Sequence, residues 1–241
     1  MVTKTRQTDP VRARPGPPDL LSIPDFSPPS KLALELVVFG FALCLLLLPA
    51  CKPKEIQDLL GPSQALVSVA ADEAASLAGA KKQVALITHD GSWGPPSSAE
   101  EGLQHALKKR GLTVATVKSA SLGNPMLSGA IGLKAADFLE ALQKSTGSGV
   151  VISLVGAPQL TPDDITHLPT DHPPVLVIAT AMLGDKMGVR GDPLQLATLL
   201  ESQVIQLAII DGSDATPNTS GKRDPARELF AQRYQILRRP R

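Results

Sequence analysis

The chain has 241 residues, a formal net charge of +1 and only 3% aromatic residues. It therefore lacks the excess of basic residues that attracts nucleic acid and the rings that stack on bases, so no nucleic-acid partner is predicted. Its two cysteines, Cys44 and Cys51, both lie near the N-terminus. The rest of the sequence thus has no cysteine for a disulfide, a metal site or a thiol nucleophile.

The N-terminal segment has two parts of opposite composition. Residues 1–30 are rich in proline and basic residues, which predicts a disordered segment. A run of apolar and small residues then extends from Leu36 to Ala50. It is shorter than the about 20 residues that a membrane helix needs, and it matches the apolar region of a secretory signal.

The apolar run ends in Leu48-Pro49-Ala50-Cys51. This ending resembles the lipobox of bacterial lipoprotein signals, with Leu at −3, a small residue at −1 and Cys at +1. The resemblance implies that Cys51 is lipidated and holds the protein to a membrane. The expected location is the bacterial cell envelope, on the periplasmic or extracellular face. Pro49 is unusual at position −2 of a lipobox. The alternative interpretation is therefore that residues 31–51 form a membrane anchor that is not cleaved.

The remaining sequence alternates between short apolar runs and amphipathic segments. Residues 52–80 are predicted to form a tether and a helix outside the folded domain. Strands are predicted at residues 84–87, 112–117, 150–155, 175–179 and 204–210. Helices are predicted at residues 98–110, 134–144, 162–167, 193–202 and from 225 onward.

This alternation predicts an α/β fold. Apolar strands that are separated by helices form a parallel sheet, and right-handed connections place the helices on both of its faces. We therefore expect residues 81–241 to form a single domain with a doubly wound, mainly parallel five-stranded sheet. The architecture would be a Rossmann-like or flavodoxin-like three-layer sandwich, followed by a basic C-terminal helix.

The carboxyl ends of the parallel strands are the predicted ligand-binding edge, because ligands of open α/β sheets bind there. Polar residues and glycines follow four of the five strands. The candidate ligand-binding residues are His89, Asp90, Ser92, Trp93, Gly156, Thr180, Asp211 and Asp214.

Each of these candidates has a second interpretation. His89 and Asp90 are an acid–base pair or the caps of a turn. Trp93 either stacks on a flat ligand or covers the edge of the domain. Asp211 and Asp214 hold a cation together with Asp90, or they only form a turn.

Known catalytic and cofactor motifs are missing from the sequence. It has neither a Gly-x-Gly-x-x-Gly phosphate loop after the first strand, nor a Walker loop, nor a Gly-x-Ser-x-Gly elbow. The strand-end residues also provide no set of nucleophile, base and orienting group. We therefore predict no catalytic residue, no metal and no cofactor.

One unit of the sequence resembles a known family. Val84–Val117 is similar to the first β-α-β unit of periplasmic sugar-binding proteins of the type I fold. The similarity consists of an apolar strand, a loop that contains Trp93, and a helix that ends in Ala106-Leu107-Lys108-Lys109-Arg110-Gly111. The resemblance implies a small-molecule ligand. Those proteins have two lobes, whereas one lobe is expected here.

Three functions agree with this sequence. The first is a lipid-anchored, non-catalytic binding or sensing module, which could act as a homodimer. The second is an envelope hydrolase or transferase that uses His89, Asp90 and Asp211. The third is a structural lipoprotein that holds another envelope protein through its basic C-terminal segment, residues 222–241. The missing catalytic set favours the first.

Overall fold

The computed structural model describes residues 54–91, 94–122, 132–212 and 224–239. Residues 52–241 belong to one unit, and residues 1–53 lie outside the described residues. The predictions for residues 1–30, for the apolar run and for Cys51 therefore stay predictions. Within the described ranges, no helix combines the length and the hydrophobicity needed to span a membrane.

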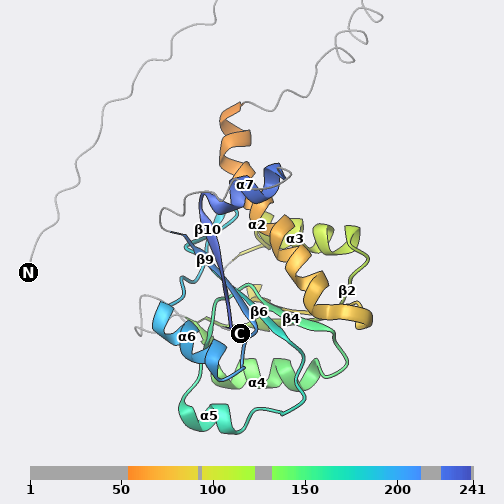
Figure 1. The fold of residues 1–241 in the computed structure, drawn as a ribbon, viewed down its shortest axis with the longest axis vertical. Helices are drawn as coiled ribbons and strands as arrows, with labels where there is room; N and C mark the ends of the chain where they lie inside the picture. The colour runs from red at the N-terminus through yellow and green to blue at the C-terminus, as the bar shows by residue number, and fades with distance from the viewer. Residues whose placement is uncertain (1–53, 92–93, 123–131, 213–223, 240–241) are drawn as a thin grey trace, which may run out of the picture. The chain divides into compact units, whose positions relative to one another are not determined.

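A six-stranded sheet forms the centre of the domain (Figure 1). Its order is β10-β9-β6-β4-β1-β2, and all neighbours are parallel except β10 and β9. The strands are β1 (Gln83–His89), β2 (Thr113–Ala120), β4 (Val150–Ser153), β6 (Val175–Ala179), β9 (Leu207–Asp211) and β10 (Tyr234–Arg238). The predicted α/β class with a mainly parallel sheet is confirmed, with six strands in place of five.

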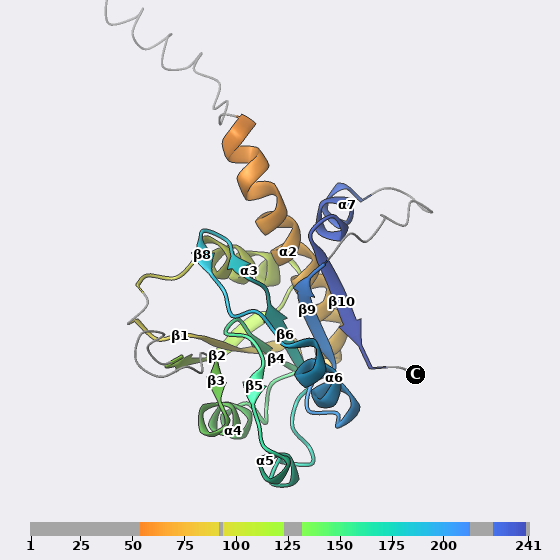
Figure 2. The same cartoon turned by 90° about the vertical axis from the view of Figure 1, so that its left-hand side faces the viewer.

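Helices cover both faces of this sheet (Figures 1 and 2). One layer contains α2 (Lys54–Ala78), α3 (Ser98–Lys109) and α7 (Pro225–Ala231), and the other contains α4 (Ala135–Lys144), α5 (Pro162–Thr166) and α6 (Pro193–Glu201). Successive side chains of β1 point to opposite faces of the sheet and so contact different helix layers. Val84 and Leu86 pack into the core beneath α2 and α3, whereas Ala85 and Ile87 pack into the core beneath α4 and α6.

Short elements connect these layers. A 3-10 turn, η1 (Gly79–Lys81), joins α2 to β1. Two residue pairs form a parallel ladder between β3 (Leu133–Lys134) and β5 (Pro158–Gln159). An antiparallel hairpin consists of β7 (Met182–Leu183) and β8 (Lys186–Met187).

Helix α2 belongs to the folded domain, which corrects the predicted boundary at residue 81. Leu66, Ala70 and Ala74 recur every four residues along one face of α2 and are fully buried against the sheet. Two ion pairs fix the same helix at its surface. Arg110 Nε lies 2.5 Å from Asp72 Oδ1, and Arg238 Nη2 lies 2.6 Å from Glu73 Oε2.

The C-terminal helix is shorter than predicted. Asp224 caps it as expected, because the Ala226 amide donates to Asp224 Oδ1 over 3.0 Å. The helix ends at Ala231, and β10 then pairs with β9 from Tyr234 to Arg238. The basic segment thus forms a short helix and an edge strand, with Tyr234 buried in the core.

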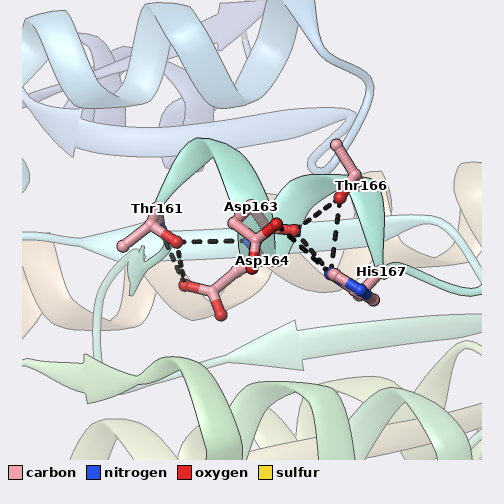
Figure 3. Close-up of polar contacts among 5 residues, drawn as sticks. All are labelled: Thr161, Asp163, Asp164, Thr166 and His167. Carbon is pink, nitrogen blue, oxygen red and sulfur yellow. Dashed lines mark hydrogen bonds and ion pairs between the residues drawn. The ribbon is translucent and has the colours of Figure 1, made fainter.

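Helix α5 is a single turn that is fixed by its own side chains (Figure 3). The Asp164 amide donates to Thr161 Oγ1 over 3.2 Å, and the Thr161 amide donates to Asp164 Oδ2 over 2.8 Å. The Thr161 amide and the Thr161 hydroxyl both donate to Asp164 Oδ2, and these two hydrogen bonds lower the pKa of the Asp164 carboxyl. His167 Nδ1 lies 2.8 Å from the Asp163 carbonyl at the end of the turn. The polar residues of α5 therefore stabilise a helix end.

Candidate functional site

A cavity of about 570 Å³ opens at the carboxyl ends of β1 and β2. The strand order reverses between β1 and β4, because the chain passes from β1 to β2 on one side and then returns to β4 on the other. Ligands of doubly wound sheets commonly bind at such a reversal, but this cavity lies on the β2 side of β1, and no residue of β4 lines it. Residues from β1, β2, the loop that follows β1, the start of α3 and β8 line the cavity: Thr88, His89, Gly91, Gly94, Pro95, Pro96, Ser97, Glu100, Val117, Ser119, Lys186 and Met187.

A β-bulge in strand β2 directs two of these side chains into the cavity. Val84 pairs with Val114, but Ala85 pairs with Thr116, so Ala115 is an extra residue. Beyond the bulge the alternation of side chains is reversed. Val117 and Ser119 then lie on the α3 side of the sheet beside Thr88, which pairs with Ser119.

The β7–β8 hairpin forms the opposite wall. Its turn contains Gly184 at φ +71°, packed directly against the start of α3. Asp185 accepts a 2.7 Å hydrogen bond from the Ser98 amide, and this bond lowers the pKa of the Asp185 carboxyl. Lys186 Nζ donates to the Pro95 carbonyl. These contacts hold Lys186 and Met187 at the cavity.

The first turn of α3 contributes a buried carboxyl group. Ser97 caps the helix by accepting a 3.1 Å hydrogen bond from the Glu100 amide. The Glu100 residue is only 7% exposed, although its side chain lines the cavity. Burial raises the pKa of this carboxyl, and the nearby Lys186 charge partly opposes the rise.

His89 lies at the end of β1 and is partly buried in the cavity wall. Burial lowers the pKa of its imidazole, Lys186 lowers it further, and Asp90 acts in the opposite direction. The ring is therefore neutral at pH 7 and can both donate and accept a hydrogen bond. Asp90 follows directly, and its amide donates to the Ala120 carbonyl at the end of β2.

The other predicted residues form loops away from the cavity. Asp211 Oδ2 accepts hydrogen bonds from the Ala181 amide at 2.8 Å and from Arg190 Nε at 3.3 Å. Thr180 Oγ1 donates to the Met182 carbonyl at 2.9 Å. Gly156 has φ +79°, and an added Cβ would lie 2.9 Å from Val189. These contacts shape the loops that follow β4, β6 and β9.

The predicted ligand edge is thus only partly assembled. His89 lines the cavity, whereas Asp90, Gly156, Thr180 and Asp211 do not. His89 ends β1 and Asp211 ends β9, with β4 and β6 between them, which is about 14 Å at the usual strand spacing. This separation keeps His89 and Asp211 from sharing one hydrogen-bonded cluster. Ser92, Trp93 and Asp214 lie outside the described residues.

Most of the residues that line the cavity were not predicted from the sequence. One signal was present, because Ser97 and Glu100 have the spacing of a helix-capping pair and mark the start of α3. Val117 and Ser119 depend on the bulge, and Lys186 depends on the hairpin, so the strand-end rule does not find them. In the described part of the chain, no cluster of three or more His, Cys, Asp or Glu residues is placed to hold a metal ion.

Solved structures that resemble this chain include two proteins of bacterial sugar uptake by their names. No protein-family model and no curated protein matches the sequence. GanP, a glucose-galactose binding protein from Geobacillus stearothermophilus, is similar at a TM-score of 0.39 and 9% identity, over 73% of this chain and 60% of that one. A periplasmic ribose ABC transporter from Conexibacter woesei is similar at a TM-score of 0.37 and 12% identity, over 70% of this chain and 48% of that one.

This chain covers less than two thirds of the length of either protein. Both TM-scores are below 0.5.

Proposed function

We propose that this protein is a non-catalytic binding module of the bacterial cell envelope, with a small-molecule ligand in the cavity at the ends of β1 and β2. The observation that carries the proposal is the cavity itself. Its volume of about 570 Å³ is within the range of about 300–1,000 Å³ that is typical of small-molecule sites.

The lining of the cavity supports the same proposal. Pro95, Val117 and Met187 provide apolar surface, and His89 and Lys186 add polar groups that converge on the same space. A few polar groups in an apolar wall are typical of a site that orients a ligand. The enzyme alternative needs His89 and Asp211 together, and their separation in the sheet favours binding over catalysis.

The envelope location rests on the N-terminal sequence. We propose that Cys51 is lipidated and that the domain is displayed from a membrane on the periplasmic or extracellular side. The lipobox resemblance of Leu48-Pro49-Ala50-Cys51 supports this part of the proposal.

Val117→Trp tests binding in the cavity. Val117 is 52% exposed on an edge strand, so a larger side chain is compatible with the fold and would fill the cavity. Calorimetric titration of the full chain with D-glucose, D-ribose, adenosine, L-leucine and alanyl-leucine should detect at least one ligand. We expect Val117→Trp to weaken its binding by at least tenfold.

Thr113→Trp is the matched control, because Thr113 is an exposed residue of the same strand and does not line the cavity. This variant should bind as the wild type does. The proposal fails if no compound of the panel binds, or if Val117→Trp binds the ligand as tightly as Thr113→Trp.

A further inference from the structure

Two groups of opposite charge face the cavity without pairing with each other. Glu100 lines it from the first turn of α3, and Lys186 lines it from β8. The Lys186 charge lowers the pKa of the Glu100 carboxyl and so opposes part of the rise that burial causes. Among the described residues, however, no ion pair within 4.0 Å joins them. The space between them is therefore open to a ligand that contacts both.

The Glu100 carboxylate needs a partner. The residue is 7% exposed, and the described part of the chain gives its carboxylate neither a hydrogen-bond donor nor an ion-pair partner. Burial removes part of the water around this carboxylate, and the charged form is disfavoured when no partner replaces that water. A ligand with a cationic ammonium group would supply an ion-pair partner for the Glu100 carboxylate.

Lys186 offers the complementary charge. Its ammonium group has three donors, and one of them is used by the Pro95 carbonyl. The remaining donors are available to an anionic group of a ligand. Charge-assisted hydrogen bonds of this kind are stronger than neutral ones and fix the orientation of the ligand.

The other residues of the cavity wall indicate the chemistry of the part of the ligand that lies between Glu100 and Lys186. Pro95, Pro96, Val117 and Met187 form apolar surface along the cavity. Met187 is an exposed methionine, and its flexible side chain adapts to apolar groups of different shape. The body of the ligand should therefore be apolar.

On the basis of the proposed function, we infer that the cavity binds a zwitterion with an apolar body, which is the chemistry shared by apolar amino acids and short peptides. The ammonium group of the ligand would pair with Glu100, and its carboxylate would pair with Lys186. The side chain would pack on Val117 and Met187. His89 would contribute a neutral imidazole beside the two charged groups.

Calorimetry with matched analogues tests this inference on the full chain. L-leucine and alanyl-leucine represent the two sources, a free amino acid and a peptide. N-acetyl-leucine lacks the ammonium charge, and leucinamide lacks the carboxylate. We expect leucine or alanyl-leucine to bind, and each analogue to bind at least tenfold more weakly than leucine.

The variants should respond selectively. Glu100→Gln should weaken leucine binding at least tenfold, and N-acetylation should then cause little further loss. Lys186→Gln should likewise weaken leucine binding at least tenfold, and replacing the carboxylate of leucine by the amide of leucinamide should then cause little further loss. Glu101→Gln is the control, because Glu101 is an exposed carboxylate of the same helical turn, and it should leave binding unchanged.

The outcomes separate this inference from the proposed function. If D-glucose or adenosine binds in a Val117-dependent way while leucine and alanyl-leucine do not, cavity binding stands and the zwitterion is wrong. Equal affinity for leucine and both analogues would also overturn the inference, and this comparison needs only the wild-type protein. If no compound binds, the inference and the proposed function both fail.

Discussion

Gly184→Ala is expected to destabilise the protein by about 2–4 kcal/mol and to abolish binding in the cavity. Gly184 has φ +71°, a conformation that disfavours any residue with a Cβ. An added Cβ would also lie 2.5 Å from Ser98 Oγ and 2.7 Å from the Ala99 amide nitrogen. The backbone of α3 cannot yield easily, so the hairpin that carries Lys186 must move.

Gly111→Ala separates the effect of the positive φ from the effect of the steric contact with α3. Gly111 has φ +72°, nearly the same as Gly184, but an added Cβ there would meet nothing within 4 Å. This control should lose only about 1–2 kcal/mol and keep its ligand affinity. Urea unfolding measures the free energy of unfolding, and calorimetry measures the ligand affinity. Equal losses in the two variants would show that the contact between the hairpin and α3 is unimportant.

Cys51→Ser is expected to release the protein from the membrane. A lipobox without its cysteine cannot be lipidated, and the lipid is the proposed anchor. In a bacterial host, fractionation and labelling with a radioactive fatty acid should place the wild type in the membrane fraction with label. The variant should carry no label and should leave the membrane fraction.

Cys44→Ser is the matched control, because Cys44 is the other cysteine of the chain and lies inside the apolar run. It should keep both the label and the membrane location. If Cys51→Ser remains in the membrane like Cys44→Ser, the uncleaved anchor over residues 31–51 is the better interpretation.

The central strands were predictable because they are apolar along their whole length. Val175–Ala179 of β6 is buried at every position, as expected for a strand covered on both faces. Helix starts were also predictable from local chemistry. Asp192 and Asp224 cap α6 and α7 through the hydrogen bonds that their position before a proline suggests.

Elements that depend on tertiary pairing were not predictable. β10 is a strand because β9 offers it an edge, whereas its basic residues and the preceding Asp224-Pro225 start favoured a longer helix. The β7–β8 hairpin has only two residues in each strand, too few for a periodic pattern. Helix α2 was predicted as a helix, but its small alanine side chains give a weak hydrophobic signal and did not indicate that it packs on the sheet.

The candidate site shows the same limit. His89 was found because strand ends of a parallel sheet bind ligands, and that rule depends only on the order of the elements. Glu100 and Lys186 come from a helix start and a hairpin that meet only in the folded protein. Val117 and Ser119 face the cavity because Ala115 is a bulge, which the alternating sequence of β2 does not show.

Proton NMR of the histidine rings tests the cavity most directly. The chain has four histidines, and of these His89 lines the cavity, whereas His105, His167 and His172 do not. Without ligand, the His89 ring should titrate below its ordinary pKa of 6.5, because burial and Lys186 disfavour its charged form. A His89→Gln variant assigns its signals.

L-leucine, alanyl-leucine and D-glucose are then added in turn at constant pH. A bound ligand is expected to shift the His89 ring signals in a saturable way and to leave those of the other three histidines in place. Binding in this cavity is contradicted if a compound that binds by calorimetry leaves the His89 signals unchanged, or shifts only those of His105, His167 or His172.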